Sequence, residues 1–248
     1  MMSKREPPRL PHTRAALYEE TYNRGRMITV HHLNNSRSQR VLWLLEELGC
    51  EYQVVRYQRD PATLLAPPEL KRVHPLGKSP VITDGAHTLA ESGAIIEYLL
   101  DRYGDGRLRP PAGSPERLRY NYWLHYAEGS AMPPLLLKLV FQRLPRPPVP
   151  ALIRPIVRAV AQRAQQRFID PQLRTHIGFW ESELGKSTWF AGEELSGADV
   201  QMSFPLEAAA ARAGIALGPK VSGFLERIHA RPAYRRALAA GGEFQLAR

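Results

Sequence analysis

The sequence has a single cysteine, Cys50, so no disulfide can form within the chain. That scarcity is typical of a reducing compartment, and we expect a cytoplasmic protein. Long hydrophobic runs are also missing. The run over 135–141 is interrupted by Lys138 and is far shorter than the roughly 18 residues that a membrane span needs. Residues 1–8 carry no hydrophobic signal core. We therefore expect no membrane association.

The histidines do not follow the spacing of metal ligands. His31 and His32 are adjacent in a strand-like run, so their side chains are predicted to point to opposite faces. His125, His176 and His229 have no partner at ligand spacing. The sequence therefore predicts no metal site.

The net charge is strongly positive, at +10. Between Lys138 and Arg174, eight basic residues stand against one acidic residue, Asp170. Either this stretch is a solvated helix face, or it attracts acidic substrates or a polyanion. Nucleic acid is not an expected partner, because the stretch lacks the interleaved aromatic residues of single-strand binders.

The composition and the predicted secondary structure change along the chain. Residues 1–26 are polar and contain prolines, and we interpret them as an N-terminal extension. Beyond them, β-branched residues over 28–32 and 52–57 predict two strands. An apolar stripe over 36–49 predicts a helix between these strands. This strand–helix–strand order is typical of a parallel pair.

A hairpin is predicted next, because Asp84-Gly85 separates two short apolar runs, and a helix follows over 92–103. The segment 105–113 is rich in Gly, Arg and Pro and is interpreted as a linker. Beyond it no strand is predicted. Helices are expected over 115–141 with a bend near Pro133-Pro134, 153–184, 196–213, 221–230 and 232–240.

The first of three candidate motifs, residues 34–40, lies where the first helix begins. Helix N-termini carry unpaired N–H groups and a partial positive charge. Arg37 and Arg40 add cationic charge, which suits an anion bound there, and Ser36 can donate its hydroxyl hydrogen to that anion. Alternatively, Ser36 or Ser38 is simply an N-cap.

The second motif is Lys78-Ser79-Pro80. If the Ser79–Pro80 bond is cis, the Ser79 backbone faces outward and can pair with an extended peptide, although X–Pro bonds are usually trans. The third motif is Glu91-Ser92. Ser92 is a candidate N-cap at a helix start that suits a carboxylate, and Glu91 suits a ligand ammonium, so the pair fits an α-amino acid. Alternatively, Glu91 only favours the helix dipole.

On this βαβ-ββα framework, the three motifs resemble the glutathione S-transferase superfamily, in its serine-type, bacterial and fungal cytosolic form. The resemblance covers roughly residues 27–240, and its most specific pieces are 77–82 and 89–92. Ser196-Gly197-Ala198-Asp199 is similar to the capping box of the family's helical domain, and 126–134 is similar to a bacterial and fungal branch.

The resemblance implies a thioredoxin-like α/β domain over 27–104, joined through the linker over 105–113 to an all-α helical bundle over 114–240. Residues 241–248 form a tail. It also implies a homodimer.

Glutathione is the implied co-substrate, and Ser36 is the implied catalytic residue that hydrogen-bonds the sulfur and favours its thiolate. If the alignment of this segment with the family shifts, Ser38, Asn34 or Asn35 takes that role. The implied glutathione-binding residues are Lys78, Ser79, Pro80, Glu91 and Ser92. Of these, Ser79 pairs with the cysteinyl main chain, and Glu91 and Ser92 hold the γ-glutamyl group.

The implied reaction is attack of the thiolate on a small hydrophobic electrophile, because only the ionised thiol is a good nucleophile. Tyr126, Met132 and Phe141 are candidates for the electrophile pocket, or are ordinary packing residues. Serine at position 36, where other members of the family carry cysteine, disfavours a thiol reductase. Two alternatives stay open: a non-catalytic glutathione- or ligand-binding scaffold, and a glutathione-dependent peroxidase, isomerase or dehalogenase.

Overall fold

The computed structural model describes residues 27–242 and 244–247, so the extension predicted over 1–26 lies outside the described residues. One four-stranded sheet forms the first half of the described chain, with the strand order β2-β1-β3-β4. Its strands are β1 (Ile28–Leu33), β2 (Tyr52–Tyr57), β3 (Val81–Asp84) and β4 (His87–Ala90). The parallel β1–β2 pair and the β3–β4 hairpin confirm two predictions from the sequence.

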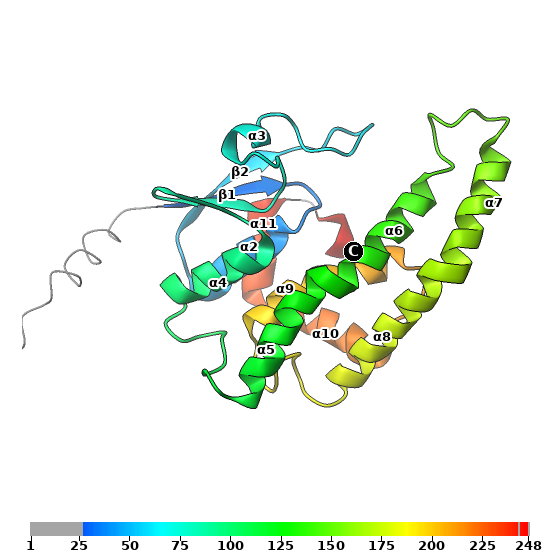
Figure 1. Ribbon diagram of the computed structural model, residues 1–248. Coiled ribbons are helices and arrows are strands. Elements are labelled where there is room, and N and C mark those ends of the chain that lie inside the picture. The colour runs from blue at the N-terminus through cyan, green and yellow to red at the C-terminus, as the bar shows by residue number, and fades with distance from the viewer. Residues whose placement is uncertain (1–26, 243, 248) are drawn as a thin grey trace, which may run out of the picture.

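Two helices, α2 (Ser38–Leu48) and α4 (Ser92–Tyr103), pack together beside this sheet (Figure 1). The apolar stripe of α2 is fully buried, and the helix ends at Gly49, whose φ of 71° is a left-handed conformation that glycine adopts without steric cost. A short helix, α3 (Leu70–Val73), was not predicted, because its four residues are too few to show a periodic pattern.

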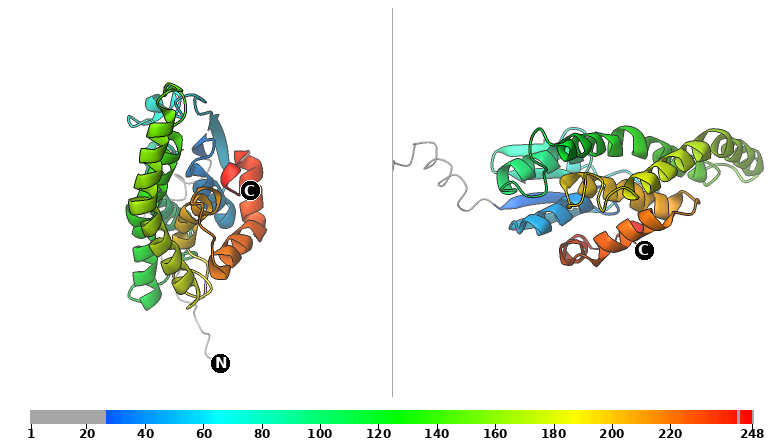
Figure 2. Two further views of the ribbon diagram at one scale, coloured as in Figure 1. Left: turned by 90° about the vertical axis from the view of Figure 1, so that its right-hand side faces the viewer. Right: turned by 90° about the horizontal axis from the view of Figure 1, so that it is seen from below.

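The second half is helical in the described residues, as predicted. Its helices are α5 (Pro115–Tyr126), α6 (Met132–Arg143), α7 (Arg154–Ala164), α8 (Asp170–Leu184), α9 (Gly197–Arg212), α10 (Pro219–Ala230) and α11 (Pro232–Gly241). In Figures 1 and 2, α6 and α7 form a hairpin that extends beyond the rest of the molecule.

The long helix predicted over 115–141 is interrupted by a π-helical turn, η1 (Ala127–Ala131), which separates α5 from α6. Pro133 and Pro134 lack N–H groups, so neither can donate to the carbonyl four positions earlier, and those two carbonyls fall within η1. A second π-helical turn, η2 (Gln165–Ile169), separates α7 from α8. Such turns often occur at functional sites.

The core is organised around α9, which lies between α5–α6 and α10–α11 when the molecule is seen from below (Figure 2). Its start is fixed by the predicted capping box, in which the Ser196 N–H and hydroxyl both donate to Asp199. No helix in the described part of the chain is long and apolar enough to cross a membrane.

Within the tail predicted over 241–248, residues 244–246 return to the body of the molecule. Phe244 and Leu246 are buried, and a 3-10 turn, η3 (Gln245–Ala247), contacts α9.

Candidate functional site

Ser36 lies in the turn between β1 and α2, and its side chain is buried. Its Oγ is 2.7 Å from the Oγ of Ser38 and accepts the Ser38 N–H at 3.2 Å. The Ser36 hydroxyl donates to the Oγ of Ser79 at 3.4 Å. The helix itself begins later than predicted, at Ser38, and Arg37 occupies the N-cap position without a side-chain cap. The structure therefore brings the first two motifs together.

A hydrogen-bonded chain leads from the sheet to Ser36. The Oγ of Ser38 is 2.9 Å from the Nδ1 of His32. Burial, with a smaller effect of the Arg56 charge, lowers the pKa of His32 to about 4, so this imidazole is neutral at pH 7. With the proton on Nδ1, His32 donates to Ser38 and Ser38 donates to Ser36. The hydroxyl hydrogen of Ser36 then points to the Oγ of Ser79 at 3.4 Å, a long bond that a ligand acceptor can replace.

The second and third motifs are adjacent because of the sheet register. Val81 and Ala90 are paired across β3 and β4, which places Pro80 beside Glu91. The Ser79–Pro80 bond is cis, as the sequence argument for an outward-facing Ser79 required. Lys78 is exposed, whereas Ser79 is half-buried and donates its hydroxyl to the His31 carbonyl at 3.0 Å.

The bounds of α4, Ser92–Tyr103, match the helix predicted over 92–103, but the predicted N-cap was wrong. Ser92 was expected to be the N-cap, but it is the first helical residue, and Glu91 occupies the N-cap position. Glu91 has a φ of 72°, although it is not a glycine, and its side chain is exposed and makes no cap hydrogen bond. Such a backbone conformation costs about 1–3 kcal/mol and tends to occur at functional sites. Ser92 is buried beside it.

Arg37 and Arg40, which the sequence assigned to a bound anion, share a carboxylate of the protein itself. Glu128 in η1 accepts from Arg37 Nε at 2.9 Å and from Arg40 Nη1 at 2.6 Å. Burial raises the pKa of Glu128, but the two arginines outweigh it and hold that pKa below its usual range. Arg40 is almost fully buried, and Gln201 of α9 also accepts from it at 3.0 Å.

Sequence reasoning missed Glu128 and Gln201 because each meets Arg40 only across the interface between the two domains. The one available signal was the position of Glu128 within the segment 126–134 that carries part of the family resemblance.

The predicted electrophile-pocket residues are mostly interior. Tyr126 and Met132 belong to the hydrophobic core, and Phe141 packs against it, partly buried. The Tyr126 hydroxyl contacts His176 and accepts the indole N–H of Trp180 at 3.1 Å. As walls of an electrophile pocket, these residues stay predictions.

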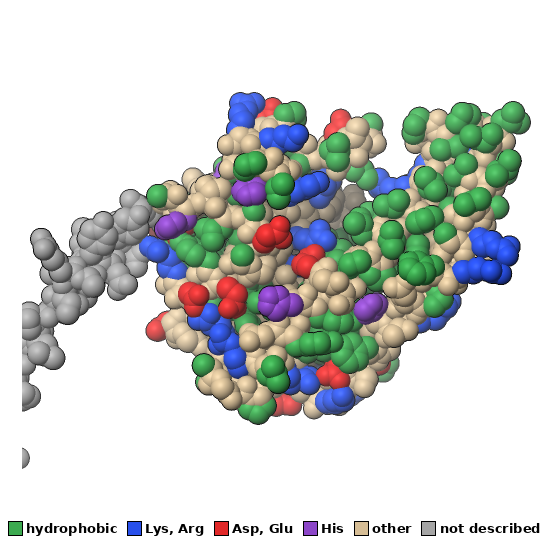
Figure 3. All heavy atoms as spheres, in the orientation of Figure 1, with side chains coloured by type: hydrophobic (Ala, Val, Ile, Leu, Met, Phe, Trp, Pro, Cys, Tyr) green, Lys and Arg blue, Asp and Glu red, His purple; other side chains and the backbone are tan. Residues whose placement is uncertain are grey.

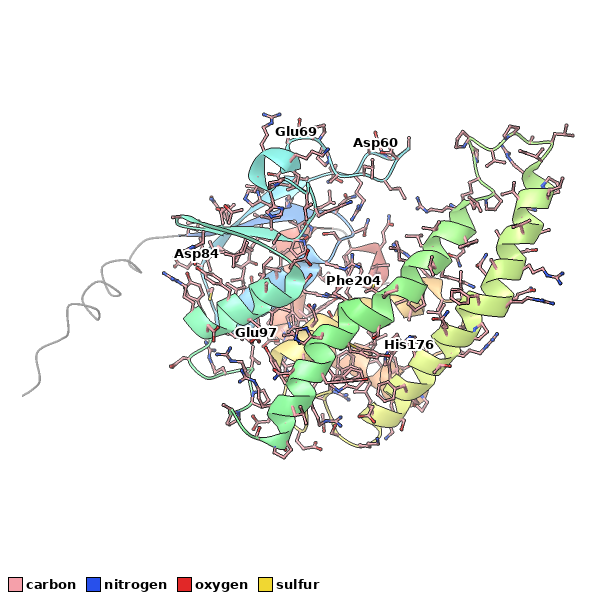
Figure 4. All side chains as sticks on the ribbon, in the orientation of Figure 1. Asp60, Glu69, Asp84, Glu97, His176 and Phe204 are labelled. Atoms are coloured by element: carbon pink, nitrogen blue, oxygen red, sulfur yellow. The ribbon has the colours of Figure 1, made fainter. Side chains whose placement is uncertain are left out.

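Phe204 and the C-terminal tail border the turn that carries Ser36, and sequence reasoning named neither of them as part of the site. The Phe204 ring of α9 lies 5.1 Å from the guanidinium carbon of Arg37, at the junction of the two domains (Figure 4). The Gln245 N–H donates to the Oδ1 of Asn35 at 2.8 Å, next to Ser36. The end of the described chain therefore borders the site.

The site combines a buried hydroxyl and the start of a helix, which both favour an anion, with two arginines whose charge Glu128 offsets only in part. A thiolate is one anion that suits such a setting. Cys50 is not activated, because burial raises its pKa above the usual range. Among the described residues, no group of three or more His, Cys, Asp or Glu side chains could hold a metal ion.

Comparison with known proteins gives matches over both domains. Residues 25–101 match the family model "Glutathione S-transferase, N-terminal domain", and residues 149–232 match "Glutathione S-transferase, C-terminal domain". Glutathione S-transferase 1 of Saccharomyces cerevisiae is 36% identical over 231 residues, which cover 88% of this chain and 98% of the yeast protein.

Two crystal structures extend the comparison. A glutathione S-transferase from Actinobacillus pleuropneumoniae is 37% identical, with a TM-score of 0.75 over 90% of this chain and 96% of that chain. A glutathione transferase family member from Pseudomonas fluorescens Pf-5, with two glutathione molecules bound, is 25% identical, with a TM-score of 0.67 over 90% and 97%. Because relatives at this level of identity match nearly their full length, the chain is a transferase and belongs to the glutathione S-transferase family.

Proposed function

We infer that this protein conjugates glutathione to small hydrophobic electrophiles, with Ser36 as the catalytic residue. The observation that carries this proposal is the hydrogen bonding of Ser36. Its oxygen accepts the Ser38 N–H and contacts the Ser38 hydroxyl, and its own hydrogen is engaged only in a long bond of 3.4 Å to the Oγ of Ser79, which a sulfur atom can replace as acceptor. A free thiol has a pKa of about 8.5 and is mostly protonated at neutral pH. A donated hydrogen bond and the helix start both lower that pKa.

The other motifs supply a binding surface for the rest of glutathione. We assign the γ-glutamyl ammonium to the exposed carboxylate of Glu91 and the γ-glutamyl carboxylate to Ser92, at the start of α4. The backbone of Ser79 pairs with the cysteinyl unit, beside Pro80, and Lys78 meets the glycyl carboxylate. The adjacency of these motifs across β3 and β4 supports the assignment. The glutathione bound in the structural relative from Pseudomonas fluorescens Pf-5 supports glutathione as the ligand.

The chemical step follows from these roles. The thiol proton passes to solvent, and Ser36 stabilises the thiolate that remains. The thiolate attacks an electrophilic carbon, so that a carbon–sulfur bond forms. In an aryl halide, the carbon–halogen bond then breaks and the halide leaves with the bonding electron pair.

Replacing Ser36 with alanine tests the proposal. We expect Ser36→Ala to lower turnover of an aryl halide by more than about tenfold while glutathione affinity changes little, since the lost bond acts on the sulfur. The pKa of bound glutathione, followed through thiolate absorbance, is expected to rise. Unchanged turnover would reject Ser36. Activity towards a peroxide or a disulfide, without activity towards the aryl halide, would favour a different glutathione-dependent reaction.

We also propose that two copies of the chain form a homodimer in the cytoplasm. The hairpin of α6 and α7 exposes a set of large apolar side chains, which favour burial against another surface (Figure 3). They are Leu136, Leu137, Val140, Leu144, Ile153, Ile156 and Val160. Sedimentation at micromolar concentration is expected to give a mass twice the chain mass of 28.0 kDa. The substitution Ile156→Glu is expected to lower the measured mass towards that of a single chain. A single-chain mass for the unmodified protein would contradict the dimer.

A further inference from the structure

Three arginines meet beside the proposed site, and they are hereafter the arginine cluster. Arg59 follows β2, Arg143 ends α6 and Arg212 ends α9. The Arg59 N–H donates to the Oδ1 of Asn34 at 2.8 Å, and its Nε donates to the Asn34 carbonyl at 3.2 Å. These bonds fix Arg59 against the turn that carries Ser36.

The helical domain brings the other two arginines close to each other. Gln142, the neighbour of Arg143, donates its side-chain amide to the Arg212 carbonyl at 3.1 Å, so the ends of α6 and α9 meet. Burial and then the Arg143 charge lower the pKa of Arg212. Burial and then the charges of Arg37 and Arg212 lower the pKa of Arg59. In Figure 3, Lys and Arg side chains lie along the boundary between the sheet and α6.

No carboxylate of the described chain compensates this charge. Among residues 27–242 and 244–247, no ion pair involves a member of the arginine cluster. Glu128 is shared by Arg37 and Arg40, so it does not neutralise a third arginine. Helix dipoles favour a cation at the ends of α6 and α9, but they leave the mutual repulsion of like charges in place.

We propose that the arginine cluster receives a carboxylate or another anionic group carried by the electrophile, so that the enzyme prefers hydrophobic electrophiles with such a group. The inference rests on the proposed conjugation reaction and names its substrate class. A guanidinium binds a planar carboxylate through two parallel N–H bonds, and the partial burial of Arg212 strengthens the attraction. Arg59 contributes mainly its charge, because its Nε and Nη1 already donate to the carbonyls of Asn34 and Leu64. The net charge of +10 adds long-range attraction. The anionic group itself does not react.

A matched pair of substrates tests this inference. A chlorodinitrobenzoate and its methyl ester undergo the same displacement of chloride by the thiolate, and they differ in charge. For each substrate, kcat/KM is divided by the rate constant for its uncatalysed reaction with glutathione, which removes the difference in intrinsic reactivity. The variants are Arg212→Gln and the exposed Arg143→Gln. Arg174→Gln, exposed on α8, is the control, because it changes the net charge equally.

The unmodified enzyme is expected to prefer the acid, and salt is expected to weaken that preference. Arg212→Gln and Arg143→Gln are each expected to lower the acid-to-ester ratio by about fivefold, with Arg174→Gln unchanged. An unchanged ratio in both cluster variants would overturn the inference. A KM for glutathione that rises equally with both substrates in the cluster variants would also overturn it, because the cluster would then bind the glutathione carboxylate. If neither substrate is turned over, the conjugation reaction itself is wrong.

Discussion

Glu91 holds a backbone conformation that non-glycine residues rarely adopt, with a φ of 72°. The sheet register requires the chain to turn there, because β4 ends at Ala90 and α4 begins at Ser92. A glycine would make this turn without steric cost, so the retained carboxylate is consistent with a role in binding. The proposed ligand is the γ-glutamyl ammonium of glutathione.

Removing the Glu91 carboxylate is expected to change the free energy of unfolding and glutathione binding in opposite directions. We expect Glu91→Gly to raise the free energy of unfolding by up to about 1 kcal/mol, because it relieves the strained φ. Retention on immobilised glutathione is expected to fall about tenfold, because a charge-assisted contact is lost. Glu91→Gln is the control. It keeps the strain and removes the charge, so binding alone should fall. Full retention of both variants would refute the assignment.

The π-helical turn η1 is the element that connects the two domains at the site. It carries Glu128, whose carboxylate pairs with Arg37 and Arg40 at the start of α2. Because Arg40 is almost fully buried, removal of its counter-charge leaves an uncompensated cation in the interior.

We therefore expect Glu128→Gln to lower the free energy of unfolding by about 3 kcal/mol, even though the side chain keeps its shape. Urea unfolding measures this change. Glu226→Gln on α10 is the matched control, because Glu226 is exposed and carries the same charge. If the two variants lose equal stability, the ion pairs at η1 do not stabilise the domain interface.

At the scale of the whole molecule, buried histidines make folding sensitive to acid. Burial lowers the pKa of His32 to about 4, from 6.5 in the unfolded chain, and it also lowers the pKa values of His31 and His176. Between these two pH values the unfolded chain binds a proton that folded His32 does not bind. The contribution of His32 is therefore fully present above pH 6.5 and is lost as the pH falls towards 4.

The corresponding loss for His32 is about 3 kcal/mol between pH 6.5 and 4. Asp199 acts in the opposite direction, because burial raises its pKa to about 6. We therefore compare urea unfolding of the unmodified protein and His32→Asn at pH 7 and near the lower limit of this window. The variant, which cannot titrate there, is expected to show the flatter pH dependence. Equal pH dependence in the two proteins would be inconsistent with a neutral, buried His32.

The sequence by itself determined the features that depend on near neighbours. Periodic apolar residues predicted α2 and α4, Gly49 predicted the end of α2, and the Ser196–Asp199 capping box predicted the start of α9. These features form between residues a few positions apart, so local propensity and side-chain spacing decide them.

Only the tertiary structure decided which side chains meet. Ser36 and Ser79 are 43 residues apart, Arg37 and Glu128 are 91 apart, and Asn35 and Gln245 are 210 apart. Contacts over such distances depend on how both domains pack around α9, and no local pattern encodes them. For the same reason the sequence identified the arginines of the first motif but assigned them to an external anion, whereas Glu128 lies between them in the folded chain.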